Sequence, residues 1–184
     1  MAEQQASFNI EKIYVKDLSL EVPNAPQVFM QADSPQLDVQ VHTAAEHFTD
    51  ALYEVVVTVT VTAKSGDKTM FLAEVAQGGI FTIMNVPAEE LDPLLGIGCP
   101  TILYPYVREA VSDVVTRAGF PPVLLAPVSF EALYMQRMQE QGAAEQGRIE
   151  IAHRPSARSW RQRSSPALHT RRPPISAPWP KAPR

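Results

Sequence analysis

The chain has 184 residues, of which 45% are apolar, and it carries a net charge of −4 with a single cysteine, Cys99. This composition fits one folded domain with an appendage, and the lack of any run of about 18 apolar residues excludes a transmembrane helix. One cysteine rules out an internal disulfide, and the first residues show neither the basic start nor the apolar core of a secretory signal, so we expect a cytoplasmic protein.

The net charge conceals two parts of opposite sign. Residues 1–147 hold 7 Lys or Arg against 19 Asp or Glu, a net charge of −12, whereas residues 148–184 hold 9 against 1, a net charge of +8. All eight glycines lie in the first part, and both tryptophans lie in the second. We therefore predict a folded domain at 1–147 and a basic, disordered tail rich in Pro, Arg and Ser at 148–184.

Alternation of apolar and polar residues predicts four strands in the first half of the chain, at about 8–22, 37–43, 53–63 and 69–83. A short hairpin turn joins the last two, because Gly66 supplies a positive φ at little cost. Pro23, Pro26 and Pro35 prevent regular pairing between the first two strands and predict an extended crossover loop.

Strict alternation along the first strand assigns its side chains to two faces. Phe8, Ile10 and Tyr14 share the inner face, and Ile13 and Val15 fall on the outer face. The third strand is a long Val/Thr run, which is hazardous if exposed. This strand is either central and well covered, or protected by oligomerisation.

Two helices are predicted to follow the strands. Apolar residues at a spacing of three to four indicate a helix from about Pro105 to Ala118, with Pro105 in the first turn and Gly119 ending it. Ser129 is expected to cap a second helix that ends before Gly142. Strands followed by helices indicate an α+β fold: a four-stranded antiparallel sheet with two C-terminal helices packed on one face.

The residues offer poor material for catalysis, so we expect no enzyme activity, no cofactor and no metal site. His42 and His47 are interpreted as solvated groups at a strand edge, and Cys99 as a buried small apolar residue. Gly78-Gly79 lacks the third glycine, the helix and the lysine of a phosphate-binding loop. It predicts a bend or bulge where backbones approach closely.

Three separated segments carry a family resemblance, and their sequences are KDLSLEVPNAP (16–26), TMFLAEVAQGGIFTI (69–83) and APVSFEAL (126–133). Together they make residues from about Phe8 to Gln141 similar to SecB, a family of cytoplasmic protein-export chaperones of Gram-negative bacteria. The resemblance implies a homotetramer built as a dimer of dimers. It also implies a chaperone that binds unfolded precursor proteins without ATP, keeps them competent for translocation and delivers them to the export ATPase SecA.

The resemblance further implies an acidic patch for SecA, formed by Asp17, Glu21, Leu72 and Glu74. The basic C-terminal segment of SecA docks on such a patch, and its zinc belongs to SecA. The charge of −12 on residues 1–147 would steer a basic partner towards the domain.

A second surface is predicted from apolar residues. The crossover loop contains Val28, Phe29 and Met30, which either fold back onto the core or form a groove wall facing the second helix. In the latter case the client-binding groove is lined by Phe29, Met30, Phe130, Leu133, Tyr134 and Met138. Aromatic and thioether side chains of this kind adapt to varied apolar partners.

Two other functions stay open from the residues themselves: a nucleic-acid-binding module that acts through the Arg-rich tail, and an oligomeric domain with a small-ligand pocket. The acidic domain argues against nucleic acid, and we expect no direct membrane insertion. The tail is either a reading-frame accident, an added electrostatic arm or a plain disordered end. Whatever its origin, we hypothesise that it competes with the basic segment of SecA for the acidic domain.

Overall fold

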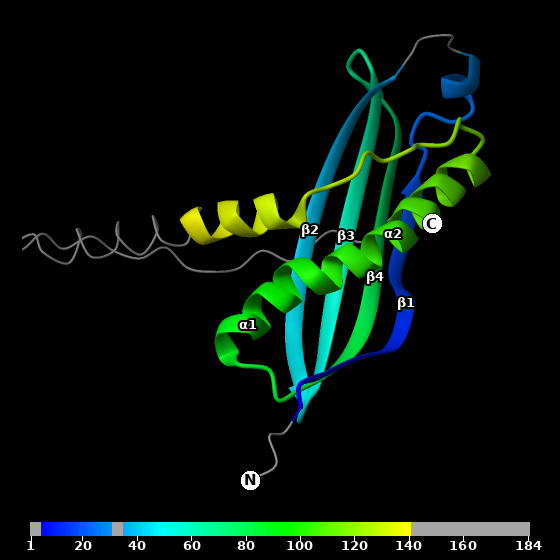
Figure 1. The fold of residues 1–184 in the computed structure, drawn as a ribbon. Coiled ribbons are helices and arrows are strands. Elements are labelled where there is room, and N and C mark those ends of the chain that lie inside the picture. The colour runs from blue at the N-terminus through cyan, green and yellow to red at the C-terminus, as the bar shows by residue number, and fades with distance from the viewer. Residues whose placement is uncertain (1–4, 31–34, 141–184) are drawn as a thin grey trace, which may run out of the picture. The chain divides into compact units, whose positions relative to one another are not determined.

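The computed structural model describes residues 5–30 and 35–140, all of which belong to the unit Met1–Glu145. The predicted tail at 148–184 lies outside the described residues. The strands are β1 (Ser7–Glu21), β2 (Gln36–Thr49), β3 (Leu52–Ser65) and β4 (Lys68–Met84). They form an antiparallel sheet in the order β1-β4-β3-β2, as Figure 1 shows. The predicted fold class is confirmed, and β3 occupies a central position.

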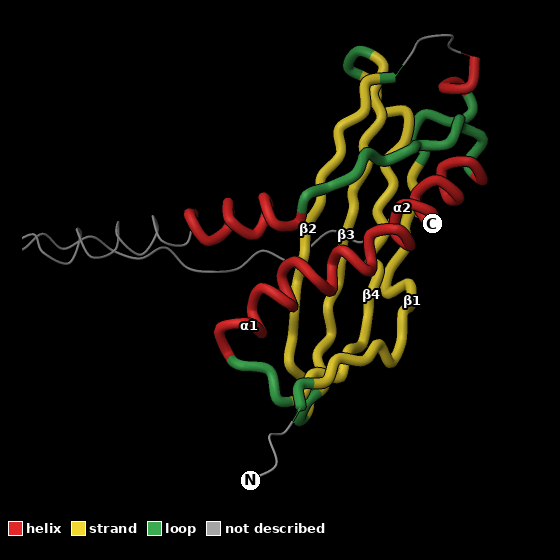
Figure 2. Tube along the Cα trace, viewed as in Figure 1, coloured by secondary structure: helices red, strands yellow, loops and turns green. Residues whose placement is uncertain are grey.

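The helices follow the sheet in the sequence and lie to one side of it (Figure 2). They are α1 (Ala88–Pro93), the π-helical turn η2 (Leu94–Gly98), α2 (Cys99–Arg117) and a last helix at 130–140. Glycine at 119, with a φ of 91°, follows α2, and the amide of Phe120 donates to the carbonyl of Val115. This 6→1 bond is the Schellman arrangement that commonly ends helices, so the predicted stop is confirmed.

The predicted start of the first helix was wrong, because α2 begins at Cys99 and Pro105 lies inside it. Pro105 stands on the exposed side of the helix, where solvent can satisfy the carbonyl that loses its donor. The π-helical turn precedes Pro100, and in it the Cys99 amide donates to Leu94. Such a turn shifts the hydrogen-bond register just before a residue that has no N–H to donate.

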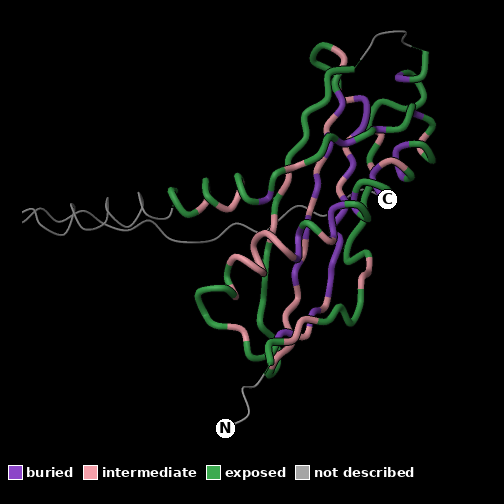
Figure 3. Tube along the Cα trace, viewed as in Figure 1, coloured by how far each residue is buried: buried purple, intermediate pink, exposed green. Residues whose placement is uncertain are grey.

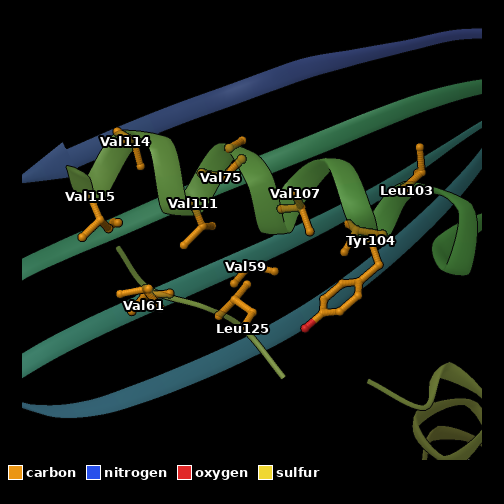
Figure 4. Close-up of a cluster of buried hydrophobic side chains, with 14 of the residues drawn as sticks. Val59, Val61, Val75, Leu103, Tyr104, Val107, Val111, Val114, Val115 and Leu125 are labelled. Carbon is orange, nitrogen blue, oxygen red and sulfur yellow. The ribbon is translucent and has the colours of Figure 1, made fainter. Parts of the chain in front are cut away.

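The core lies between α2 and one face of the central strands. Alternate residues of β3 from Val55 to Ala63 have no exposed surface, and they meet a stripe of buried residues on α2 (Figures 3 and 4). That stripe consists of Leu103, Tyr104, Val107, Ala110, Val111, Val114 and Val115. Burial of side chains of this size stabilises a fold by about 1.5–3 kcal/mol each, so the sheet and α2 form one folded unit.

Two β-bulges in β1 reverse the faces that strict alternation predicts for the residues between them. Its register with β4 shifts between Ile10 and Lys12 and again between Val15 and Asp17. Each extra residue reverses which face the following side chains occupy. Ile13 and Val15 therefore lie on the face that α2 covers, and Tyr14 lies on the opposite face.

The glycine pair was expected to mark a bend or bulge, yet β4 runs through it in continuous register with both neighbouring strands. The space that side chains at these two glycines would occupy is filled by the side chains of neighbouring residues. A Cβ on Gly78 would lie 2.7 Å from the ring of Tyr14, and a Cβ on Gly79 would lie 2.7 Å from Phe81 and 2.8 Å from Leu103. The glycines therefore make room for rings on the two faces of the sheet.

Candidate functional site

The sheet face turned away from α2 carries all four predicted SecA-binding residues. We call it the outer face; it is formed by the even-numbered residues 52–62 of β3 and 72–84 of β4 and by their partners on β1 and β2. Glu21 pairs with Leu72, Ser19 with Glu74 and Asp17 with Ala76, all across β1 and β4. Because Ala73 and Val75 point into the core, Leu72 and Glu74 must point outward. The structure thus gathers Asp17, Glu21, Leu72 and Glu74 on one side of two adjacent strands.

The carboxylates of this group are held in different ways. Glu74 accepts a hydrogen bond of 2.9 Å from the hydroxyl of Thr60, its direct partner on β3. Asp17 and Glu21 are exposed on the edge strand β1. Among residues 5–30 and 35–140, none of the three carboxylates takes part in an ion pair. Glu21 lies opposite the half-buried Leu72, and Glu74 lies two residues further along β4. Asp17 lies opposite Ala76, so the three carboxylates form a row on the outer face with Leu72 at one end.

On the same outer face, the carboxylate of Glu54 is paired with a cation of the chain itself. The carboxylate of Glu54 receives the ammonium of Lys16 at 2.7 Å and a short hydrogen bond from the hydroxyl of Tyr14. These bonds, that of Lys16 first, lower the pKa of Glu54 below its ordinary value. The bond to Glu54 raises the pKa of Tyr14 to about 12. The bridge spans β4 from β1 to β3, over Gly78.

The crossover segment lines an apolar hollow at one end of the sheet. Val28 is 4% exposed, so this part of the loop does fold back, whereas Phe29 is half exposed and Met30 is 87% exposed. The Phe29 ring lies 5.1 Å from that of Phe120. The hollow has a volume of about 410 Å³, and its lining residues are Val28, Phe29, Pro35, Leu37, Met70, Phe71, Phe120, Pro121, Pro122 and Val123.

The last helix occupies a different place. The Ser129 hydroxyl accepts the amide of Ala132, which confirms the predicted cap. Phe130 is buried edge-on against Tyr104, and the hydroxyl of Tyr134 donates to Asp92 of α1. Leu133 is half buried beside β2, and Met138 is 48% exposed. This helix is tied to α1 and to the β2 edge.

Within residues 5–30 and 35–140, the six predicted groove residues lie in two groups: Phe29 and Met30 on the crossover segment, and Phe130, Leu133, Tyr134 and Met138 on the last helix. The client-binding groove stays a prediction. In Figure 1 the turn η1 (Gln27–Met30) is drawn at the upper right, and the last helix is drawn at the left, next to β2. The partner of Phe29 is Phe120, which the sequence analysis missed. The sequence does contain a signal for this contact: an aromatic residue followed by two prolines, Phe120-Pro121-Pro122, comes directly after the glycine that ends α2. The two apolar surfaces stay separate candidates for client binding.

The described part of the chain contains no group of His, Cys, Asp and Glu arranged to hold a metal ion, and no helix in it is long and apolar enough to cross a membrane. Cys99 is fully buried, and burial raises the pKa of its thiol to about 12. A thiol with that pKa stays protonated and unreactive at neutral pH.

Comparison with known proteins assigns the chain to a family. The family described as preprotein translocase subunit SecB matches residues 1–141. The chain belongs to the SecB family. A protein-export protein SecB from Chromobacterium violaceum is 63% identical over 142 residues, which cover 77% of this chain and 95% of the relative. Proteins of the same name from Methylobacillus flagellatus (62%, covering 77% and 90%) and Neisseria meningitidis (57%, covering 77% and 97%) are also similar to this SecB-family chain.

A solved structure shares the fold. The SecB-like chaperone of Mycobacterium tuberculosis, in complex with a peptide from an antitoxin, superimposes with a TM-score of 0.56. It is 21% identical, and the match covers 66% of this chain and 90% of that one. The likeness supports the SecB-like arrangement of sheet and helices.

Proposed function

We propose that this SecB-family chain is a cytoplasmic chaperone for protein export. It binds unfolded precursor proteins without ATP, keeps them competent for translocation, and passes them to SecA. The row of carboxylates formed by Asp17, Glu21 and Glu74, with Leu72 at one end, on one face of β1 and β4 is the observation that carries the proposal. Relatives named as protein-export proteins support it as well.

The two surfaces suit two partners. The hollow beside Phe29 is apolar and concave, and it accepts a side chain of an extended polypeptide. The acidic group lies on the outer face of the sheet, whereas α2 covers the other face, and it attracts a basic segment. A client and SecA can therefore be bound at the same time, which a transfer step requires.

A homotetramer is part of the proposal. On the face of β1 towards α2, Ile10, Val15 and Leu18 are each about half exposed, at 47%, 50% and 46%. β1 is also an edge strand with one unpaired side. Exposed apolar residues along an unpaired edge favour association with a further copy. Size-exclusion chromatography with mass measurement tests the assembly, and a monodisperse monomer would contradict it.

The chaperone activity is tested by light scattering from a reduced, unfolded precursor without ATP. Stoichiometric chain should suppress the scattering. Met30→Ser should weaken this suppression, because Met30 is 87% exposed and the change does not disturb the core. Burial of one such side chain by a client contributes at most about 1.5–3 kcal/mol. Met84→Ser, at a position that is 44% exposed at the end of β4 and outside both apolar surfaces, is the matched control.

The docking of SecA is tested by calorimetric titration of the full chain. A triple variant with Asp17→Asn, Glu21→Gln and Glu74→Gln should lose most of the affinity, whereas the control Asp50→Asn, Glu89→Gln and Glu90→Gln removes the same charge elsewhere. If both variants lose the same amount of SecA affinity, the loss comes from the overall charge of the chain, and a defined docking surface is refuted. Loss of SecA binding with scattering suppression intact would separate the two surfaces.

A further inference from the structure

The β-bulge at residue 16 places a cation beside the proposed docking group. Lys16 and Asp17 are neighbours in sequence, and in a regular strand they would point to opposite faces. The register shift between Val15 and Asp17 leaves Lys16 as the extra residue. Asp17 pairs with Ala76 on the outer face, and Lys16 reaches Glu54 on that same face. The side chains of Lys16 and Asp17, neighbours in the sequence, therefore both lie on the outer face.

Glu54 draws this ammonium away from Asp17. Its Oε2 lies 2.7 Å from the Lys16 nitrogen, and its Oε1 accepts the hydroxyl of Tyr14. The Glu54 side chain is only 16% exposed, whereas that of Lys16 is 47% exposed. Both oxygens are thus engaged by β1 residues that cross over β4, and the absence of a side chain at Gly78 leaves space for the Tyr14 ring.

The alternative partner for Lys16 is Asp17 itself. A lysine side chain is long and flexible, and attraction to a neighbouring carboxylate is expected once its present partner is removed. In that position it would neutralise one of the three carboxylates in the row on the outer face. It would also present a positive charge to an incoming basic segment, which disfavours binding.

We propose that Glu54 is a positioning residue for the docking surface: together with Tyr14 it holds Lys16 over β4 and so keeps Asp17 available to a basic partner segment. The inference rests on the proposed function, because it concerns the site at which SecA is proposed to dock. Glu54 acts through Lys16 and does not itself contact the partner.

A double-mutant cycle on the full chain tests this role, with SecA titrated at low ionic strength. Glu54→Gln should weaken binding more than Glu46→Gln, which removes the same charge from the position paired with Glu54 on the outer face. Adding Lys16→Gln should restore the excess loss. The effect of Lys16→Gln should be about two- to five-fold larger in the Glu54→Gln background than in the unmodified chain, the range of an exposed ion pair.

Tyr14→Phe provides a variant without a charge change, and it should weaken binding in the same direction but less. An equal effect of Lys16→Gln in both backgrounds, or equal losses for Glu54→Gln and Glu46→Gln, would overturn the inference.

A crystal structure of Glu54→Gln needs no partner, and it should show the Lys16 ammonium within ion-pair distance of Asp17. Lys16 directed elsewhere would refute the inference even if SecA binds. A chain that fails to bind SecA in any form would instead refute the proposed docking.

Discussion

Substitution of Gly79 by alanine tests how closely the sheet and α2 are packed. A Cβ at this position would lie 2.7 Å from Cε2 of Phe81 and 2.8 Å from Cδ2 of Leu103. Both of these side chains are fully buried, so neither can move aside into solvent. Gly79→Ala must therefore displace α2, shift the ring of Phe81 from its rotamer, or separate the strands.

The expected cost follows from two opposing terms. Overpacking of a close-packed core costs about 1–3 kcal/mol. Loss of backbone freedom in the unfolded chain offsets about 0.4–1 kcal/mol when glycine becomes alanine. The midpoints of these two ranges leave a net loss of about 1.3 kcal/mol, which corresponds to a fall in Tm of about 3–5 °C for a chain of this size.

Urea denaturation at one fixed protein concentration measures this loss, because self-association makes the apparent stability depend on concentration. The midpoint should fall while the slope stays the same. Gly78→Ala is the matched control. Its Cβ would meet the ring of Tyr14, which is half exposed and can swing outward. If Gly79→Ala is as stable as the unmodified chain, or no less stable than Gly78→Ala, the packing argument is refuted.

Four further predictions concern single groups. Because Lys16 and Tyr14 lower the pKa of Glu54 below 4.5, Glu54 stabilises the fold above that value and loses the effect as the pH falls through its lowered pKa. The stability difference between Glu54→Gln and the unmodified chain, from urea midpoints, should therefore be larger at pH 7 than at the acid end; a constant difference would contradict this. Cys99 should resist alkylation at pH 8 in the folded chain and react when unfolded, since burial raises its pKa to about 12, and equal rates would show that it is accessible. Ser129→Ala removes the cap of the last helix, and hydrogen exchange should report a loss of about 0.5–2 kcal/mol confined to residues 130–140. Truncation after Gly142 should strengthen SecA binding at low salt if the basic tail competes, and unchanged affinity at every ionic strength would rule that out.

Local patterns in the sequence were enough for several elements. Alternation along β3 identified the strand and its buried face, because one residue in two of a half-buried strand must be apolar whatever covers it. Ser129 and Gly119 identified a helix start and a helix end, since both act through bonds to residues a few positions away. The family resemblance likewise depended on contiguous segments, and the family match bears it out.

Tertiary contacts decided what alternation could not. The faces of β1 depend on two bulges, which arise from its pairing with β4 and leave no clear mark in a strand with alternating apolar residues. The start of α2 depends on a π-helical turn and on burial of Cys99, which outweigh the local preference of proline for a first turn. The ring of Phe29 packs against that of Phe120, because the path of the 118–129 segment determines which aromatic side chains meet. The sequence by itself determined the elements and the family, and only the packed structure decided on which face of the sheet each side chain of β1 lies.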